Sequence, residues 1–292
     1  MTTTLVNDLE RLNDPGMWRD FAHALHVVDA AFLKTQGVFD VDAASIENGR
    51  ALLIREGYFQ IPPPNWGLPI ADMAALVVRL DGAGLPVPFS FMYDEFWCLF
   101  YRLNRILEGM LGPGFLRLPD FWTWIVRPDR ADSGWRPHRD KGHAALFDDR
   151  SPKSVTVWIP LTDSTPLNGC VYIVPADRDP TYNTAEEKEW RFAYPDIRAL
   201  PAPAGTILCW NQAVLHWGSH ACARETQPRI SVAFEFQSAR AAPFNQPLTN
   251  PNEFPVFEFR VRLVAKQILQ YKHMYPLAPA IERMAKDILA RP

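Results

Sequence analysis

The chain has 292 residues, of which 48% are hydrophobic, so it is long enough for one large core or two small ones. Its 30 basic and 33 acidic side chains leave a formal net charge of −3, and no basic block is available to neutralise a phosphate backbone. Nucleic acid is therefore not an expected partner. No stretch approaches the ~20 apolar residues of a membrane span, and the first ten residues do not resemble an export signal.

The first part of the chain is predicted to be helical. Apolar residues recur at helical spacing over 16–35, 43–56 and 94–110. Gly57 ends the second of these helices, and residues 58–61 read as a short strand that three consecutive prolines stop.

The pattern changes at Phe121, where short apolar runs begin. Runs rich in Val, Ile, Trp and Phe and bounded by Gly, Pro and Asp are typical of strands. They cover 121–126, 155–160, 170–174, 206–210, 213–216 and 230–236. Helical spacing returns at 257–271 and 279–290, after a proline-rich loop at 243–255 that is long enough to cover a site.

These elements predict a mainly β fold with a helical shell. We expect one domain, residues 1–292, with a helical N-terminal part at 1–114, a β core at about 115–238, and a C-terminal lid with helices at 239–292. The four cysteines show no C-x-x-C spacing, and three of them lie beside apolar or aromatic residues, which favours buried thiols in a cytoplasmic protein.

A candidate metal-binding pair lies in the segment His138-Arg139-Asp140. In an extended chain, residues i and i+2 point to the same face, so both side chains can reach one ion. A third ligand would complete a two-histidine, one-carboxylate triad with open positions for a co-substrate and dioxygen. About one such triplet is expected by chance in this composition, so a surface His beside a surface Asp is the alternative.

Two downstream residues give the pair a context. His216 follows an apolar run, and Arg229 begins the next one. A buried arginine needs an anion, and its planar fork matches a carboxylate. Strand alternation places Arg229 and Ser231 on one face, where both can hold that carboxylate. The alternatives are a core histidine and an edge-strand arginine that points to water.

Taken together, several segments resemble the phytanoyl-CoA dioxygenase family of iron(II)- and 2-oxoglutarate-dependent oxygenases. They lie within residues 45–238 and comprise 55–59, 138–140, 168–175, 204–206, 215–219 and 229–231. The resemblance implies a double-stranded β-helix core, which is a jelly roll of the cupin type, and iron(II) held by His138, Asp140 and His216. It also implies 2-oxoglutarate and dioxygen as co-substrates. Arg229 then pairs with the distal carboxylate of 2-oxoglutarate, Ser219 and Ser231 are weaker candidates for the same carboxylate, and Trp158 lines the co-substrate pocket or packs in the core.

The chain also departs from the family. Members usually continue the segment 168–175 into Pro-Gly-Ser-His, where this chain has 175–178 as Pro-Ala-Asp-Arg. The spacing from His216 to Arg229 is slightly longer than usual, which leaves His220 as a rival third ligand. His143 is either an exposed loop residue, a further ligand or a substrate contact. Asp140 predicts oxygen insertion, because halogenating relatives carry a small residue there.

The predicted function is hydroxylation, or another oxidation, of a small molecule with release of succinate and CO2. The tryptophans at 122, 124, 135, 210 and 217 favour a partly apolar pocket, whereas arginines 127, 136 and 139 favour an acidic group. A hydrophobic metabolite and an amino-acid-like acid both stay open. A cupin-type metalloenzyme independent of 2-oxoglutarate and a non-catalytic β-sandwich binding module are the alternative classes.

Overall fold

The computed structural model describes residues 9–130, 132 and 134–291. The α-helices are α1 (Pro15–Phe21), α2 (Ala30–Lys34), α3 (Ala43–Arg55), α4 (Ile70–Gly82), α5 (Asp94–Tyr101), α6 (Asn104–Leu111), α7 (Phe257–Gln270) and α8 (Pro279–Ala290). The strands are β1 (Tyr58–Ile61), β2 (Leu116–Val126), β3 (Ser154–Pro160), β4 (Val171–Val174), β5 (Arg198–Leu200), β6 (Ile207–Asn211), β7 (Leu215–Gly218) and β8 (Arg229–Gln237). None of the helices in this described part is long and apolar enough to cross a membrane.

The strands form two antiparallel sheets. The larger has the order β1-β6-β3-β8-β2, and the smaller has the order β5-β4-β7. An isolated bridge between His138 and His216 adds the segment around residue 138 beside β7. Two facing sheets with neighbours distant in sequence form the predicted double-stranded β-helix.

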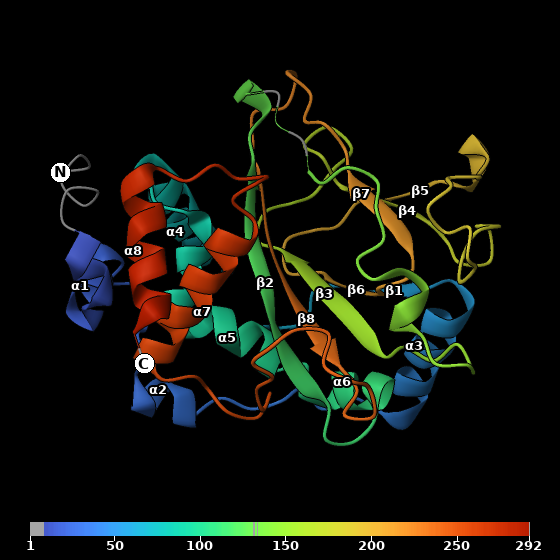
Figure 1. The fold of residues 1–292 in the computed structure, drawn as a ribbon, viewed down its shortest axis with the longest axis horizontal. Coiled ribbons are helices and arrows are strands. Elements are labelled where there is room, and N and C mark those ends of the chain that lie inside the picture. Colours follow the sequence, from blue (N-terminus) through green and yellow to red (C-terminus); the bar gives the residue numbers. More distant parts are fainter. Residues whose placement is uncertain (1–8, 131, 133, 292) are drawn as a thin grey trace.

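Helices cover one face of the larger sheet, and the smaller sheet lies on its other side (Figure 1). Strand alternation explains why both faces are used. On β8, Val232 and Phe234 belong to the core shared with the helices, whereas Arg229, Ala233 and Glu235 line a cavity on the opposite face. The cavity therefore lies between a rigid sheet and the segments that face it.

The helix predicted over 16–35 is wrong in its middle part, because α1 ends at Phe21 and α2 begins at Ala30. Buried carboxylates from α5 occupy the gap. Asp94 accepts hydrogen bonds from the backbone nitrogens of Val28 and Asp29, at 3.0 and 2.8 Å, and Glu95 accepts one from His26 at 3.1 Å. These bonds take the backbone N–H groups that a continuous helix would use.

Other predicted elements differ in length. The helix predicted over 94–110 is divided into α5 and α6 by a turn at Arg102 and Leu103. The prediction missed α4, although Met73, Leu76, Val77 and Leu80 of that helix are buried at helical spacing. It also missed β5, whose three residues are too few to show a period. The other predicted strands and helices are confirmed within a few residues, except that β2 starts earlier, at Leu116.

Candidate metal centre

Backbone pairing brings the two predicted histidine ligands together. His138 N donates to His216 O and His216 N donates to His138 O, each at 3.0 Å, so the two residues lie opposite each other on antiparallel segments. Their imidazole ring centroids are 4.4 Å apart. Side chains of directly opposed residues project from the same face of a sheet, and both imidazoles therefore reach the same point.

Asp140 completes the cluster. Its Oδ1 lies 3.3 Å from His138 Nε2 and 3.6 Å from His216 Nε2. One donor atom from each of the three residues lies within 4.8 Å of the other two. Two imidazole nitrogens and one carboxylate oxygen are the donor set of mononuclear non-haem iron(II) sites, with coordination positions left open.

Neighbouring groups leave the metal-facing atoms free. His138 Nδ1 is 2.6 Å from Arg136 O and His216 Nδ1 is 3.2 Å from Val214 O. Since a carbonyl only accepts, each Nδ1 carries the proton and each Nε2 presents its lone pair. Asp140 Oδ2 accepts hydrogen bonds from Thr156 Oγ1 at 2.9 Å and Trp210 Nε1 at 3.0 Å, which leaves Oδ1 toward the histidines. The residues fit a divalent cation.

The electrostatics also suit a cation. Burial lowers the pKa of His216 to about 4, which keeps that imidazole neutral. Burial alone would raise the pKa of Asp140, but His216 and His138 lower it well below its usual range. Burial would likewise lower the pKa of His138, but the hydrogen bond that the protonated ring donates to Asp140 and the charge of that carboxylate together raise this pKa. At neutral pH the carboxylate is ionised.

Arg229 lies at one end of the cavity as a buried guanidinium. It is 3% exposed, on a strand between two others, so the edge-strand alternative is wrong. Its Nε has no hydrogen-bond partner, and no carboxylate of the described residues lies within 4.0 Å of it. Burial lowers the pKa of Arg229 to about 10. Buried charges are normally paired, so this side chain is prepared for an anion.

Of the other residues predicted near the co-substrate carboxylate, two lie beside Arg229 and the third lies after the end of β7. Ser231 follows Arg229 on the same face of β8, and its buried Oγ also lacks a partner within the described chain. Trp158 lines the cavity, with its ring centroid 5.7 Å from the Arg229 guanidinium carbon, so it is both buried and in contact with the arginine. Ser219 follows β7 and is not among the described residues that line the cavity.

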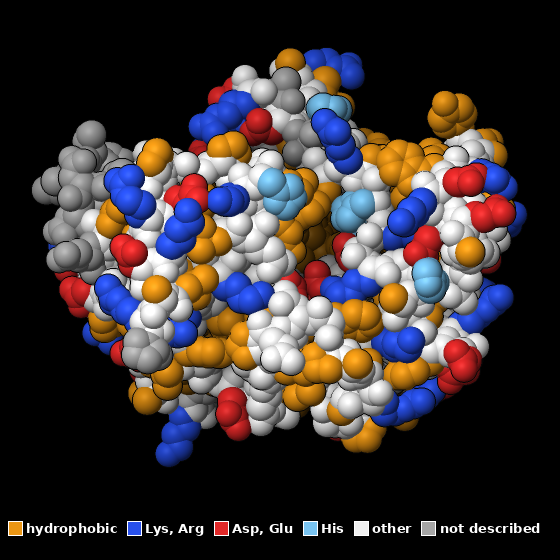
Figure 2. Space-filling view, viewed as in Figure 1, with side chains coloured by type: hydrophobic (Ala, Val, Ile, Leu, Met, Phe, Trp, Pro, Cys, Tyr) orange, Lys and Arg blue, Asp and Glu red, His pale blue; other side chains and the backbone are white. Residues whose placement is uncertain are grey.

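The cavity has a volume of about 370 Å³ and is largely aromatic. The five tryptophans at 122, 124, 135, 210 and 217 all line it, as predicted, together with Tyr271. Figure 2 shows a hollow on this face with hydrophobic side chains inside and charged side chains at its margin. Tyr271 packs edge-on against Trp122 and Trp135, at 4.9 and 5.5 Å, and Trp135 stacks on His138. The walls thus reach from the metal cluster to the C-terminal segment.

The arginines suggested for an acidic substrate group lie elsewhere. Arg127 pairs with Asp81 at 2.7 Å, and Arg139 forms a buried pair with Asp179 at 2.6 Å. Arg136 is exposed. None of the three is found among the described lining residues, so this part of the prediction is wrong.

The two rival histidines also lie outside the cluster. His143 is an exposed loop residue whose Nδ1 is 2.8 Å from Glu187 Oε1. His220 is exposed beyond β7 and does not belong to the His138, Asp140 and His216 group. The structure therefore brings together the three residues that the resemblance implied.

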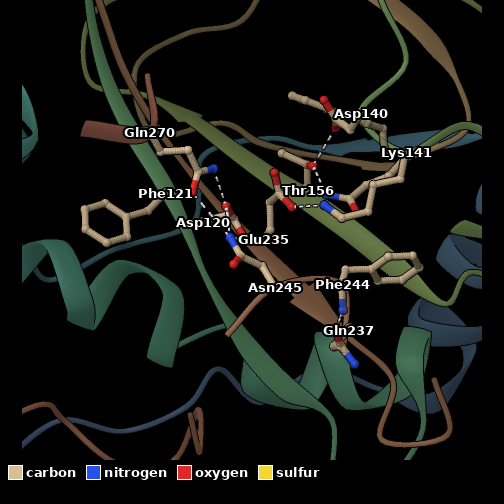
Figure 3. Close-up of polar contacts among 12 residues, drawn as sticks. Asp120, Phe121, Asp140, Lys141, Thr156, Glu235, Gln237, Phe244, Asn245 and Gln270 are labelled. Carbon is tan, nitrogen blue, oxygen red and sulfur yellow. Dashed lines mark hydrogen bonds and ion pairs between the residues drawn. The ribbon is translucent and has the colours of Figure 1, made fainter. Parts of the chain in front are cut away.

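The sequence interpretation missed a second set of polar residues in the same cavity: Asp120, Lys141, Glu235, Asn245 and Gln270. They come from β2, the loop after Asp140, β8, the 243–255 loop and the end of α7, and Figure 3 shows them on the same side of the sheet as Asp140. One signal was available. Glu235 shares the alternation phase of Arg229 and Ser231, so the sequence places its side chain on the same inward face as theirs.

A family model described as phytanoyl-CoA dioxygenase (PhyH) matches residues 105–270. The chain belongs to this family, whose members are iron(II)- and 2-oxoglutarate-dependent oxygenases. The match begins in α6 and ends with α7, so it contains all three clustered residues and Arg229. No curated protein sequence matches the chain.

Solved structures support the same fold. The epimerase SnoN in complex with Fe3+, alpha ketoglutarate and nogalamycin RO is 24% identical, with a TM-score of 0.52 over 70% of this chain and 88% of SnoN. HygX from Streptomyces hygroscopicus, with nickel and 2-oxoglutarate bound, is 14% identical, with a TM-score of 0.53 over 70% and 90%. The non-heme monooxygenase ThoJ is 13% identical, with a TM-score of 0.51 over 82% and 99%. At these identities the likeness shows the jelly-roll fold.

Proposed function

We propose that the protein is an iron(II)- and 2-oxoglutarate-dependent dioxygenase that hydroxylates a small molecule, with His138, Asp140 and His216 as the iron ligands. One observation carries the proposal. The cavity that contains two imidazole nitrogens and a carboxylate oxygen of the metal cluster also contains a buried guanidinium for which the described residues supply no anion. A keto acid can chelate a metal at one end and pair its other carboxylate with the guanidinium, so one ligand fits both sites.

Bound iron(II) would supply the site for dioxygen activation, with 2-oxoglutarate as the second reductant. The overall reaction consumes one 2-oxoglutarate, one O2 and one C–H bond, and gives succinate, CO2 and an alcohol. Arg229 and Ser231 orient the co-substrate through its remote carboxylate. Thr156 and Trp210 hold Asp140 in place through its second oxygen, and the tryptophan walls keep bulk water from the reacting atoms.

We further propose that residues 1–292 act as one catalytic domain, with 239–292 covering the cavity. Phe244 and Asn245 from the proline-rich loop, and Gln270 and Tyr271 from the end of α7, line the cavity. The C-terminal segment is therefore part of the substrate wall.

Anaerobic titration with iron(II) tests the ligand set. The natural protein is expected to bind one equivalent, His138→Ala and Asp140→Ala to bind none, and His143→Ala to behave as the natural protein. Addition of 2-oxoglutarate to the iron-loaded protein is expected to produce a visible charge-transfer band. Full iron binding in the first two variants contradicts the ligand assignment. Iron binding without any response to 2-oxoglutarate supports the cupin-type alternative, and absence of iron binding supports the binding module.

A further inference from the structure

We propose that the cavity selects a substrate that carries a protonated amine, which Asp120 and Glu235 bind at the end remote from Arg229. The inference rests on the proposed function for the place of the reaction, but it uses a different group of side chains. It names a substrate class that differs from both the hydrophobic metabolite and the acid considered from the sequence.

Asp120 is a buried carboxylate that no cation of the described residues contacts. It is 5% exposed. Asn245 Nδ2 donates to its two oxygens at 2.8 and 2.9 Å, and Gln270 Nε2 donates to Oδ1 at 2.8 Å (Figure 3). No Lys, Arg or His nitrogen of the described chain lies within 4.0 Å of this carboxylate. Neutral amides satisfy its hydrogen bonds, but they do not balance its charge.

Lys266 fixes the orientation of the side-chain amides of Asn245 and Gln270. Lys266 Nζ donates to Asn245 Oδ1 at 2.9 Å and to Gln270 Oε1 at 3.3 Å. Because the oxygens of both amides face the ammonium, their nitrogens face Asp120. Lys266 therefore stands one layer outside the cavity wall, and the free surface of Asp120 is left for a ligand inside it.

Glu235 adds a second acceptor. One of its oxygens, Oε2, is bound to Lys141 Nζ, whereas no hydrogen bond of Oε1 is found among the described residues (Figure 3). Burial raises the pKa of Glu235 to about 7, and Asp120 adds to this rise although Lys141 opposes it. The two carboxylates thus repel each other across the cavity, and a cation between them relieves that repulsion.

The ionisable side chains that line the cavity differ between its two ends. At the metal end, the charges of iron(II), Asp140, 2-oxoglutarate and Arg229 cancel, and those of Asp140 and Arg229 cancel in the unloaded protein as well. At the other end, Lys141 contacts Glu235, whereas no cation among the described lining residues contacts Asp120, and Lys266 attracts Asp120 only from behind the two amides. A substrate ammonium inside the cavity can contact Asp120 and the free oxygen of Glu235 directly. A neutral alcohol supplies no such charge, and an acid places a third carboxyl group beside these two.

A second feature points to a ligand at this end. Trp122 lies two residues after Asp120 on β2, lines the cavity and is 4% exposed. Its indole Nε1 is buried and has no hydrogen-bond partner within the described chain. Aromatic ring faces also attract ammonium groups, and the ring of Tyr271 lines the cavity beside Trp122, whose own ring is stacked on Tyr275. The wall therefore presents a donor without an acceptor, a carboxylate without a contacting cation and an aromatic surface, which together fit an amine with a hydrogen-bond acceptor nearby.

Three probes that share an aromatic body test the inference: 2-phenylethylamine, 2-phenylethanol and phenylacetate. Binding to the full-length protein is measured by calorimetry and by tryptophan fluorescence, with and without iron(II) and 2-oxoglutarate under anaerobic conditions. We expect the amine to bind at least about tenfold more tightly than the alcohol, and the acid to bind most weakly. Equal binding of amine and alcohol, or no binding by any of the three, overturns the inference.

Two variants locate the effect. Asp120→Asn and Glu235→Gln are each expected to weaken amine binding by about tenfold or more and to leave alcohol binding nearly unchanged. Asp149→Asn, an exposed carboxylate outside the cavity, is the matched control. Glu235→Gln keeps the test decisive if Asp120→Asn fails to fold. Equal losses for amine and alcohol in Glu235→Gln overturn the assignment.

The two proposals fail separately. If the 2-oxoglutarate band forms but the amine has no advantage, the oxygenase proposal stands and the amine site is wrong. If the band never forms but the amine preference is present and depends on Glu235, the amine site stands and the oxygenase proposal is wrong.

Discussion

Replacing Arg229 by methionine separates the function of this residue from its contribution to stability. The natural guanidinium is buried, and its pKa falls from 12.5 to about 10 because burial disfavours the charged form. At 1.36 kcal/mol per pKa unit this corresponds to about 3 kcal/mol of unfavourable burial at neutral pH. The penalty is present below pH 10 and fades as the pH rises toward 12.5, since the folded protein releases the proton first.

Methionine fills much of the same space without a charge. Its introduction removes the burial penalty and also the contact with Trp158, which contributes roughly 0.5–2 kcal/mol. We therefore expect Arg229→Met to leave the ligand-free protein equally stable or up to about 3 kcal/mol more stable. The affinity for 2-oxoglutarate is expected to fall by roughly 2–5 kcal/mol, about 30-fold to several-thousand-fold, because the remote carboxylate then faces no cation.

Arg139→Met is the matched control. Arg139 is also buried, but its Nη2 lies 2.6 Å from the buried Asp179, and its Nη1 donates to Ala213 O at 2.8 Å. Breaking a buried pair leaves an uncompensated carboxylate and costs roughly 3–5 kcal/mol. Urea unfolding of both metal-free variants, with calorimetric titration of 2-oxoglutarate into the iron-loaded proteins, measures both effects. Equal destabilisation by the two substitutions, or unchanged 2-oxoglutarate binding in Arg229→Met, refutes the reasoning.

Two further predictions concern the metal support and the helical layer. Thr156→Val and Trp210→Phe each remove one hydrogen bond to Asp140 Oδ2, so iron(II) affinity in anaerobic titrations is expected to fall by about 10- to 100-fold with the ligands intact; unchanged affinity argues against a role in holding the carboxylate. Gly109→Ala places a methyl group on Ile46 of α3 and is expected to cost roughly 1–3 kcal/mol in urea unfolding. Gly82→Ala meets no atom within 4 Å and is expected to be neutral or stabilising, and equal costs for the two glycines contradict the packing argument.

Local pattern explains which parts of the fold were predictable. Short apolar runs place β3, β6 and β8 because these strands are buried on both faces, and a period near 3.6 residues places α7 and α8 because these helices bury one face. The break between α1 and α2 has a different origin, since Asp94 and Glu95 capture backbone groups more than sixty residues away. No local propensity records such a contact.

The candidate metal site was predictable because its residues carry local signals. His138 and Asp140 are two residues apart, and His216 ends an apolar run. The polar end of the cavity was not predictable from the sequence, since Asp120, Lys141 and Asn245 come from three separate segments and each reads as an ordinary surface residue. Only the folded chain shows that Asn245 and Gln270 meet on one carboxylate.

Strand β8 relates the two ends of the cavity to each other. Arg229 and Glu235 share its inner face and are six residues apart, or about 20 Å at the usual rise of a strand. One strand thus presents a cation at one end and an anion at the other, with the His138, Asp140 and His216 cluster bordering the same cavity. A dianionic keto acid and a cationic substrate are then drawn to opposite ends. On the proposed functions, this polarity prevents each ligand from occupying the place of the other and sets the direction in which the substrate enters.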